Sequence, residues 1–126
     1  MEKATEIKQL LEIYYKGFAA KSGWEDTIAD DFRFTGGDMT NPTPVVGKLA
    51  YIEVIQRFSR VFSVMRVKEM MIQDSHACVI GNYDFKFPNG KEINGNVAEV
   101  WTAENGKLQS LTIYFDTQNF ANNTKP

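Results

Sequence analysis

Cysteine and histidine are almost absent from this sequence. Its 126 residues include one cysteine, Cys78, and one histidine, His76. A lone cysteine excludes an internal disulfide framework. A structural zinc site needs about four nitrogen or sulfur ligands, so the small supply of Cys and His excludes one. A Ser-His-Asp triad could use only His76. We therefore expect no metal.

Other absences narrow the functional classes. The sequence contains neither a GxxxxGK[ST] nor a GxGxxG phosphate loop, and we expect no cofactor. Lys and Arg are scattered and the net charge is −2, which argues against nucleic acid as a partner. No apolar run approaches the roughly 20 residues that cross a bilayer, so we expect no membrane partner. The start, MEKATEIK, lacks the apolar centre of a signal peptide, which makes the cytoplasm the expected location.

The composition is that of a globular protein. Apolar residues make up 43% and charged residues 24%, and the length suits a single domain over residues 1–126. Apolar residues recur every three to four positions over 5–21 and 48–62, which predicts two amphipathic helices. Thr5 is the expected N-cap of the first helix. Residues 24–28 suit one helical turn.

The second half of the chain alternates like a sheet. We expect a strand at 32–35 and four more at about 64–73, 76–87, 91–103 and 107–117, joined by short turns. Short connections make neighbouring strands antiparallel. Helices followed by strands predict an α+β domain with the helices packed on one face of the sheet. Residues 36–46 are expected to form an irregular loop, and 121–126 a frayed tail.

The registers of the last two hairpins follow from keeping one face apolar. A three-residue loop, Pro88-Asn89-Gly90, pairs Phe85 with Ile93 and suits a type I turn with a glycine bulge. A similar loop over residues 104–106 pairs Glu99 with Leu111 and keeps Leu111 on the face of Trp101. A two-residue loop would pair Glu104 with Lys107 but turn Leu111 to the other face.

Glu99 is out of place in this pattern. The stretch GNVAEVWTA puts it on the same face as Val97 and Trp101, between Val79 and Leu111 on the neighbouring strands. Apolar surroundings penalise a charge and raise the pKa of a carboxyl group, and such groups in clefts are candidates for function. Two other interpretations remain open: an ion pair with Arg33 or Arg66, or a carboxylate that reaches water at the edge of the sheet.

The order of the elements resembles a known superfamily. The segments are GWEDTIADDFRF (23–34), GKLAYIEVIQRF (47–58), VAEVWTAENGK (97–107) and LTIYFD (111–116). In order and spacing they resemble the nuclear transport factor 2-like superfamily, in its SnoaL-like and ketosteroid-isomerase-like branch. The resemblance implies a cone-shaped, mainly antiparallel sheet curved around the N-terminal helices, with an apolar cavity. It also implies a homodimer.

The resemblance also implies site residues. In the isomerases a tyrosine of the first helix and an acid on the third meander strand hold a substrate oxyanion, and these positions match Tyr15 and Glu99. The isomerase base matches Gly36, which leaves Asp38 as a substitute if its loop folds inward. A carboxylate of related hydrolases and cyclases matches Ile113. Asp116 faces away from Glu99 and is expected to be structural.

Two functions remain open. Tyr15 and Glu99 favour an isomerase, dehydratase or cyclase that acts on an apolar, carbonyl- or hydroxyl-bearing small molecule, with Asp38 as base. Gly36 and Ile113 favour a non-catalytic binding or dimeric module. His76 is expected to be exposed or at a subunit contact, and Trp24 either closes the cavity or plugs the core. The expected cavity lining is Trp24, Phe34, Phe62, Tyr83, Phe85, Val97, Trp101, Leu111 and Ile113.

Overall fold

A computed structural model of the protein describes residues 2–36 and 43–124. The helices are α1 (Lys3–Ala19), α2 (Lys48–Phe58) and α3 (Thr117–Thr124), with a 3-10 turn η1 (Glu25–Thr27). The strands are β1 (Ile28–Thr35), β2 (Val45–Val46), β3 (Phe62–Gln73), β4 (His76–Lys86), β5 (Glu92–Glu104) and β6 (Lys107–Tyr114). The described helices are too short or too polar to cross a membrane.

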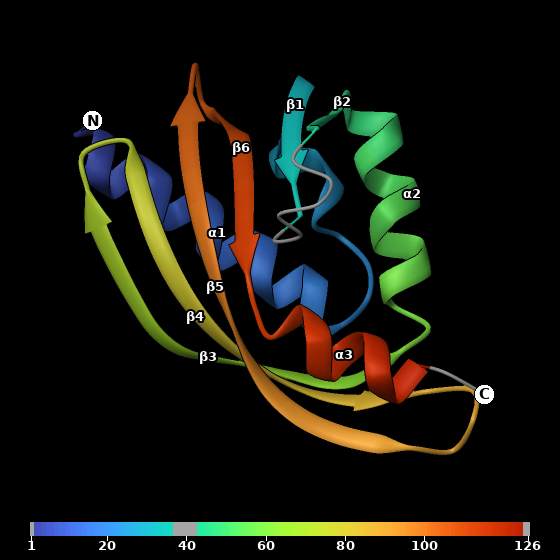
Figure 1. The fold of residues 1–126 in the computed structure, drawn as a ribbon. Coiled ribbons are helices and arrows are strands. Elements are labelled where there is room, and N and C mark those ends of the chain that lie inside the picture. The colour runs from blue at the N-terminus through green and yellow to red at the C-terminus, as the bar shows by residue number, and fades with distance from the viewer. Residues whose placement is uncertain (1, 37–42, 125–126) are drawn as a thin grey trace.

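The strands form one sheet in the order β2-β1-β6-β5-β4-β3. The β1–β6 pair is parallel and the other pairs are antiparallel. Figure 1 shows β3, β4 and β5 as long strands that bend, with the three helices on their concave side. The predicted α+β cone is confirmed.

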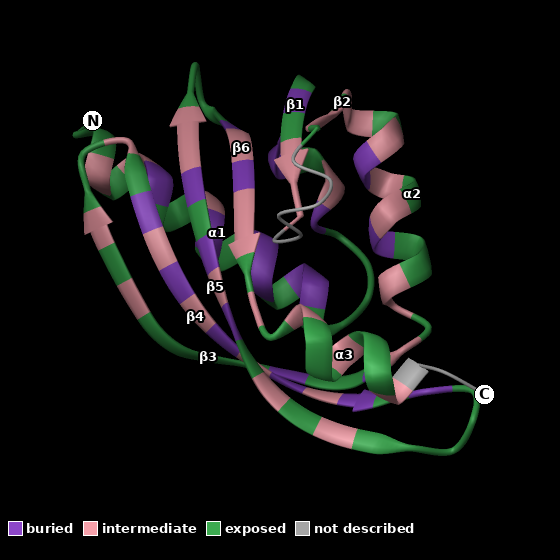
Figure 2. Ribbon diagram, viewed as in Figure 1, coloured by how far each residue is buried: buried purple, intermediate pink, exposed green. Residues whose placement is uncertain are grey.

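The alternation of the strands separates a packed inner face from an outer face. Along β4 every second residue from Ala77 to Phe85 is buried, while the residues between them are partly exposed. Figure 2 shows this banding along the strands and the buried stripe of α1. The α1 stripe includes Ile7, Leu11 and Phe18, so helix and sheet close one apolar core.

Several predicted boundaries shift. The first helix begins before Thr5, which is therefore not its N-cap; Glu2 occupies that place without a side-chain hydrogen bond. The second helix ends at Phe58 instead of residue 62, because Phe62 already pairs with Phe85 as the start of β3. Within the predicted loop 36–46, Val45 and Val46 form β2 against β1. Residues 37–42 of that loop lie outside the described residues.

The predicted frayed tail is wrong, because α3 occupies most of it. The Asp116 carboxylate accepts a hydrogen bond of 2.9 Å from the Asn119 N–H, which caps the first turn of α3. Phe120 packs edge-on against Phe85, Phe87 and Phe115. A capped helix end and one aromatic anchor thus hold a segment whose sequence is otherwise polar. The structural role expected of Asp116 fits this cap.

The first hairpin register is confirmed, and the second differs. Phe85 pairs with Ile93 across β4 and β5. At the second hairpin the three-residue loop is wrong: Glu104 pairs with Lys107 around a two-residue Asn-Gly turn. Both turn residues have positive φ, 52° and 76°, as a type I′ turn requires.

A bulge reconciles this turn with the apolar face. The register of β5 and β6 shifts between residues 102 and 103, so Gln109 is an extra residue on β6. A single extra residue inverts the facing of everything beyond it. Leu111 therefore pairs with Trp101, and Ile113 pairs with Glu99 in place of the predicted Leu111.

Candidate functional site

A cavity of about 260 Å³ lies between the helices and the inner face of the sheet. Its wall is almost entirely apolar and aromatic, with contributions from α1, α2, α3 and four strands or their ends. Among the residues that line it, Glu99 is the one charged side chain in the described part of the chain. The cavity is therefore mainly apolar, with a single carboxyl group in its described lining.

Most of the predicted lining is found in the wall. The structure places Phe34, Tyr83, Phe85, Val97, Leu111 and Ile113 there. Tyr14, Tyr51, Phe58, Phe115 and Phe120 line it as well, although the sequence did not single them out. Tyr14 and Tyr51 carry the apolar periodicity of their helices, and this periodicity marks burial without separating core from cavity.

Three predicted lining residues lie in the packed core behind the wall. Trp24 meets the rings of Tyr14 and Tyr51 edge-on, at 5.8 and 5.7 Å between centroids, and so plugs the core. Phe62 stacks on Phe18 at 5.1 Å. Trp101 is 0% exposed. These side chains support the wall, because aromatic rings in front of them take the positions that face the cavity.

Glu99 is buried with both carboxyl oxygens engaged. It is 5% exposed. Its Oε1 accepts a hydrogen bond from the Tyr15 hydroxyl and its Oε2 one from the Tyr83 hydroxyl, both at 3.0 Å. A Cβ atom on Gly81 would lie 2.9 Å from Oε1, so a glycine at that position leaves room for the carboxyl group.

No cation of the described residues balances this carboxyl group. In residues 2–36 and 43–124 no salt bridge involves Glu99, and Arg66 instead pairs with Asp84 at 2.6 Å on the outer face. Burial raises the pKa of Glu99 to about 7, against the hydrogen bonds from Tyr83 and Tyr15, which lower it. Near neutral pH, Glu99 can therefore accept a hydrogen bond as a carboxylate or donate one as an acid.

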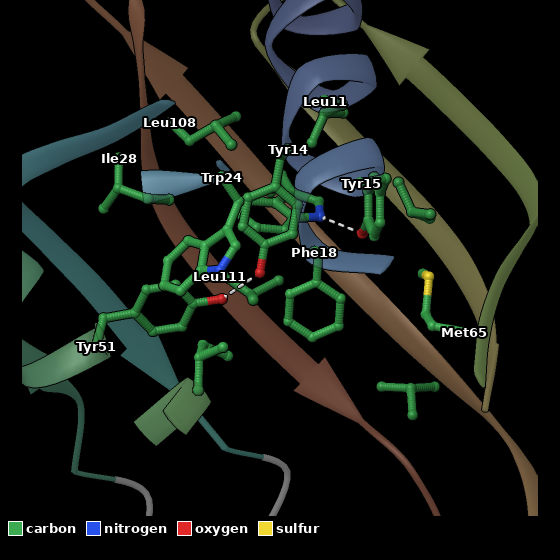
Figure 3. Packing of buried hydrophobic residues seen from close by; sticks show 14 of the residues in the cluster. Leu11, Tyr14, Tyr15, Phe18, Trp24, Ile28, Tyr51, Met65, Leu108 and Leu111 are labelled. Atoms are coloured by element: carbon green, nitrogen blue, oxygen red, sulfur yellow. Dashed lines mark hydrogen bonds between the residues drawn. The ribbon is translucent and has the colours of Figure 1, made fainter. Parts of the chain in front are cut away.

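Tyr15 contacts Glu99 and does not line the cavity. Its hydroxyl donates to Glu99 and accepts the Trp101 Nε1–H at 2.9 Å. Figure 3 draws the second of these bonds as a dashed line that ends at Tyr15. The structure brings Tyr15 and Glu99 together, as predicted. However, the Tyr15 hydroxyl hydrogen is taken by Glu99, and Tyr15 is not among the described residues that line the cavity.

A second pair of phenols lies in the wall. The hydroxyls of Tyr14 and Tyr51 are 2.6 Å apart, and Figure 3 shows them facing each other between α1 and α2. Burial raises the pKa of both hydroxyls well above the ordinary range, so both stay protonated. The site thus has one carboxyl with two phenol donors, and one phenol pair.

The other predicted site residues that the structure describes bring no further carboxylate to Glu99. Asp38 lies outside the described residues. Gly36 and Ile113 line the cavity without a carboxylate. His76 is exposed at the start of β4. No three His, Cys, Asp or Glu side chains gather as a metal site anywhere in the described ranges.

Solved structures with the same fold are numerous. No protein-family model and no curated protein matches the chain. An NTF2-like protein of unknown function from Burkholderia pseudomallei K96243 is 21% identical, with a TM-score of 0.83 over 96% of this chain and 98% of that one. The chain has the NTF2-like fold.

Two further solved structures share the fold. A candidate SnoaL-like polyketide cyclase from Jannaschia sp. CCS1 is 16% identical, with a TM-score of 0.84 over 98% of this chain and 95% of that one. TerC, crystallised with polyporic acid, is 18% identical, with a TM-score of 0.80 over 93% and 96%. At these identities the likeness concerns the NTF2-like fold, which confirms the predicted resemblance at that level.

Proposed function

We propose that the protein binds a small, mainly apolar molecule in the cavity, with a hydroxyl or carbonyl oxygen of that molecule at Glu99. The observation that carries the proposal is a buried carboxyl group on an apolar wall, held by two phenols and paired with no described cation. Apolar pockets with a few convergent polar groups and a perturbed carboxyl pKa are typical ligand sites.

The cavity volume limits the size of the ligand. An engineered cavity of about 150 Å³ holds benzene, and drug-sized ligands occupy about 300–1,000 Å³. At about 260 Å³, this cavity suits a molecule of one or two rings. Two solved neighbours favour small-molecule binding by this fold without fixing the ligand size: TerC was crystallised with polyporic acid, and another neighbour is a candidate polyketide cyclase.

We place ligand binding without catalysis ahead of an enzymatic function. Proton transfer at carbon needs a base within hydrogen-bond reach of the substrate. The two positions where the resemblance places such a carboxylate are Gly36 and Ile113, and both line the cavity without one. Glu99 is therefore the one acidic side chain in the described lining, and its two oxygens already accept hydrogen bonds from Tyr15 and Tyr83.

An isomerase, dehydratase or cyclase is the second candidate. A carboxyl with a pKa of about 7 can exchange a proton at neutral pH, which favours general acid or base catalysis by Glu99. In this second proposal Glu99 polarises the substrate oxygen, Tyr15 positions Glu99, and Asp38 is the base. Conversion of cyclohex-3-enone to its conjugated isomer, followed by ultraviolet absorbance, tests it: turnover lost in Asp38→Asn supports it, and no turnover favours the binding module.

The binding proposal is tested with 2-naphthol. We expect the wild-type protein to bind it, and Glu99→Gln to weaken binding about tenfold, because a neutral amide replaces an acceptor that is largely charged above neutral pH. Titration followed by naphthol fluorescence measures both affinities. Glu92→Gln, on the same strand but with its side chain 69% exposed, is the matched control and should bind like wild type. Equal affinity of Glu99→Gln and wild type would contradict the placement at Glu99.

A further inference from the structure

The Tyr14–Tyr51 pair holds one hydrogen that no described residue accepts. The two hydroxyls carry two hydrogens, and one of them lies in the bond of 2.6 Å between the oxygens. Neither hydroxyl has another hydrogen-bond partner within residues 2–36 and 43–124. The pair therefore has one further O–H to donate, whichever tyrosine is the donor within it.

Burial makes this spare hydrogen significant. Tyr14 is 1% exposed and Tyr51 0% exposed, and a buried O–H without an acceptor is costly. Burial also raises the pKa of both hydroxyls, so the hydrogen is not lost by ionisation. Because both tyrosines line the cavity, the cavity is the place from which an acceptor can come.

The hydrogen bonds around Glu99 have the opposite polarity. The Trp101 N–H donates to Tyr15, and Tyr15 donates to Glu99. Tyr83 donates to the other carboxyl oxygen. Each of these hydrogen bonds is donated in the direction of Glu99. As a carboxylate, Glu99 still has lone pairs for one more donor. One end of the polar lining thus offers a hydrogen, and the other accepts one.

We propose that the cavity recognises two oxygens of one ligand: the Tyr14–Tyr51 pair donates to a carbonyl oxygen, and Glu99 accepts from a hydroxyl. The ligand class is a flat hydroxyketone of one or two rings, and this inference rests on the proposed binding function. A ligand that carries a carboxylate of its own is disfavoured. Its negative charge would lie near the Glu99 carboxylate, with no described cation to balance the two.

Neighbouring tyrosines of α1 belong to the two polar groups. Tyr14 and Tyr15 are neighbours on α1, and their ring centroids are 5.1 Å apart at nearly a right angle. Tyr14 reaches Tyr51 on α2, while Tyr15 reaches Glu99 on β5. The donor pair therefore lies on the helices and the acceptor on the sheet, with apolar side chains such as Leu111 and Ile113 in the same lining.

Four probes of one shape test the two contacts separately: tetralin, 1-tetralone, 5,6,7,8-tetrahydro-2-naphthol and 7-hydroxy-1-tetralone. Calorimetry at about pH 8, where Glu99 with a pKa of about 7 is mostly ionised, gives each dissociation constant. In the wild type we expect the carbonyl and the hydroxyl each to tighten binding about tenfold. In Tyr14→Phe/Tyr51→Phe the carbonyl should lose its effect, and the hydroxyl should keep it. Glu99→Gln should do the reverse.

The double variant is used because it removes both partners of the hydrogen bond, which is nearly neutral for folding, whereas one replacement strands the other hydroxyl. Tyr114→Phe, 59% exposed, is the matched control and should leave all four constants unchanged. Isotope-edited infrared spectra of 7-hydroxy-1-tetralone bound to wild type give a measurement that needs no variant. We expect the carbonyl stretch of the bound ligand at a lower frequency than that of a carbonyl without a hydrogen bond.

The outcomes separate this inference from the binding function. A carbonyl effect that survives in the double variant, or an unshifted carbonyl stretch, overturns the donor role of the tyrosine pair. Tetralin that binds as tightly as 7-hydroxy-1-tetralone overturns the recognition of two oxygens but leaves cavity binding intact. Failure of all four probes to bind overturns both proposals.

Discussion

At the scale of the residue, Glu99 balances two opposed effects. Burial disfavours its charge, while the hydrogen bonds from Tyr83 and Tyr15 favour it. Burial is the larger effect, and the pKa moves from an ordinary value of 4.5 to about 7. A carboxyl in this state costs folding stability whenever it is ionised, and such a cost is typical of residues kept for binding or chemistry.

This balance predicts how stability depends on pH. Between about pH 4.5 and 7 the folded protein binds the Glu99 proton more tightly than the unfolded chain does, so the wild type loses stability as pH rises through that window. Glu99→Gln lacks this dependence. We expect the unfolding free energy of Glu99→Gln, relative to wild type, to increase by about 3 kcal/mol from pH 4.5 to above pH 7. Urea unfolding across this range measures it, and parallel curves would refute the raised pKa.

The sequence predicted the burial of Glu99 better than it predicted which tyrosine of α1 lines the cavity. Alternation alone placed Glu99 on an apolar face, and the structure confirms its burial beside Val79. Which tyrosine of α1 reaches the cavity depends on the rotation of the helix about its axis, and a difference of one residue turns a side chain by about 100°. Local periodicity does not determine this rotation, so the cavity-facing role of Tyr14 emerged only from the packing.

At the scale of the element, the second hairpin shows how two local rules can be satisfied together. Turn chemistry favoured the Asn-Gly loop with Glu104 opposite Lys107, and the apolar face favoured Leu111 beside Trp101. A regular ladder cannot meet both, and a bulge at Gln109 does. The prediction assumed regular pairing, so it kept Leu111 on the apolar face of Trp101 and rejected the two-residue Asn-Gly turn. The facing of the cavity residues was therefore correct while the pairing of Glu99 was off by two positions.

The helix α3 packs on the core through one aromatic side chain, Phe120. Because its sequence is mainly polar, hydrophobic periodicity did not predict this helix. Its Phe120 contacts Phe85, Phe87 and Phe115 and also lines the cavity. We expect Phe120→Ala to cost about 2 kcal/mol, below the range for a fully buried Phe since Phe120 is half-buried. Amide exchange should accelerate over residues 117–124 and stay unchanged in β4 and β5. Gln118→Ala, exposed on the same helix, is the control; slow exchange in Phe120→Ala would mean that other contacts hold α3.

At the scale of the whole molecule, the outer face of the sheet is divided into a polar and an apolar part. Arg66, Asn82, Asp84, Asn94 and Asn96 form an exposed hydrogen-bonded network on one part. The other part has two rows across the strands: Met71, Cys78, Val100 and Thr112, then Ile80, Ala98 and Tyr114, with Glu69 at the β3 end of the second row. Met71 is 52% and Tyr114 59% exposed, so this part presents large apolar side chains to solvent. Exposed apolar patches mark interaction surfaces.

We propose that two copies of the chain cover this apolar part as a homodimer, which accounts for Cys78 and Ile80 on a face that alternation makes outward. Light scattering after size exclusion at micromolar concentrations should give twice the monomer mass of 14.3 kDa. Val100→Lys, in the middle of the first row, should give the monomer mass, because dimerisation would bury an unpaired charge. Val46→Lys, 56% exposed on the distant strand β2, should stay dimeric. A wild type of monomer mass, or a Val100→Lys protein of dimer mass, would exclude this face as the interface.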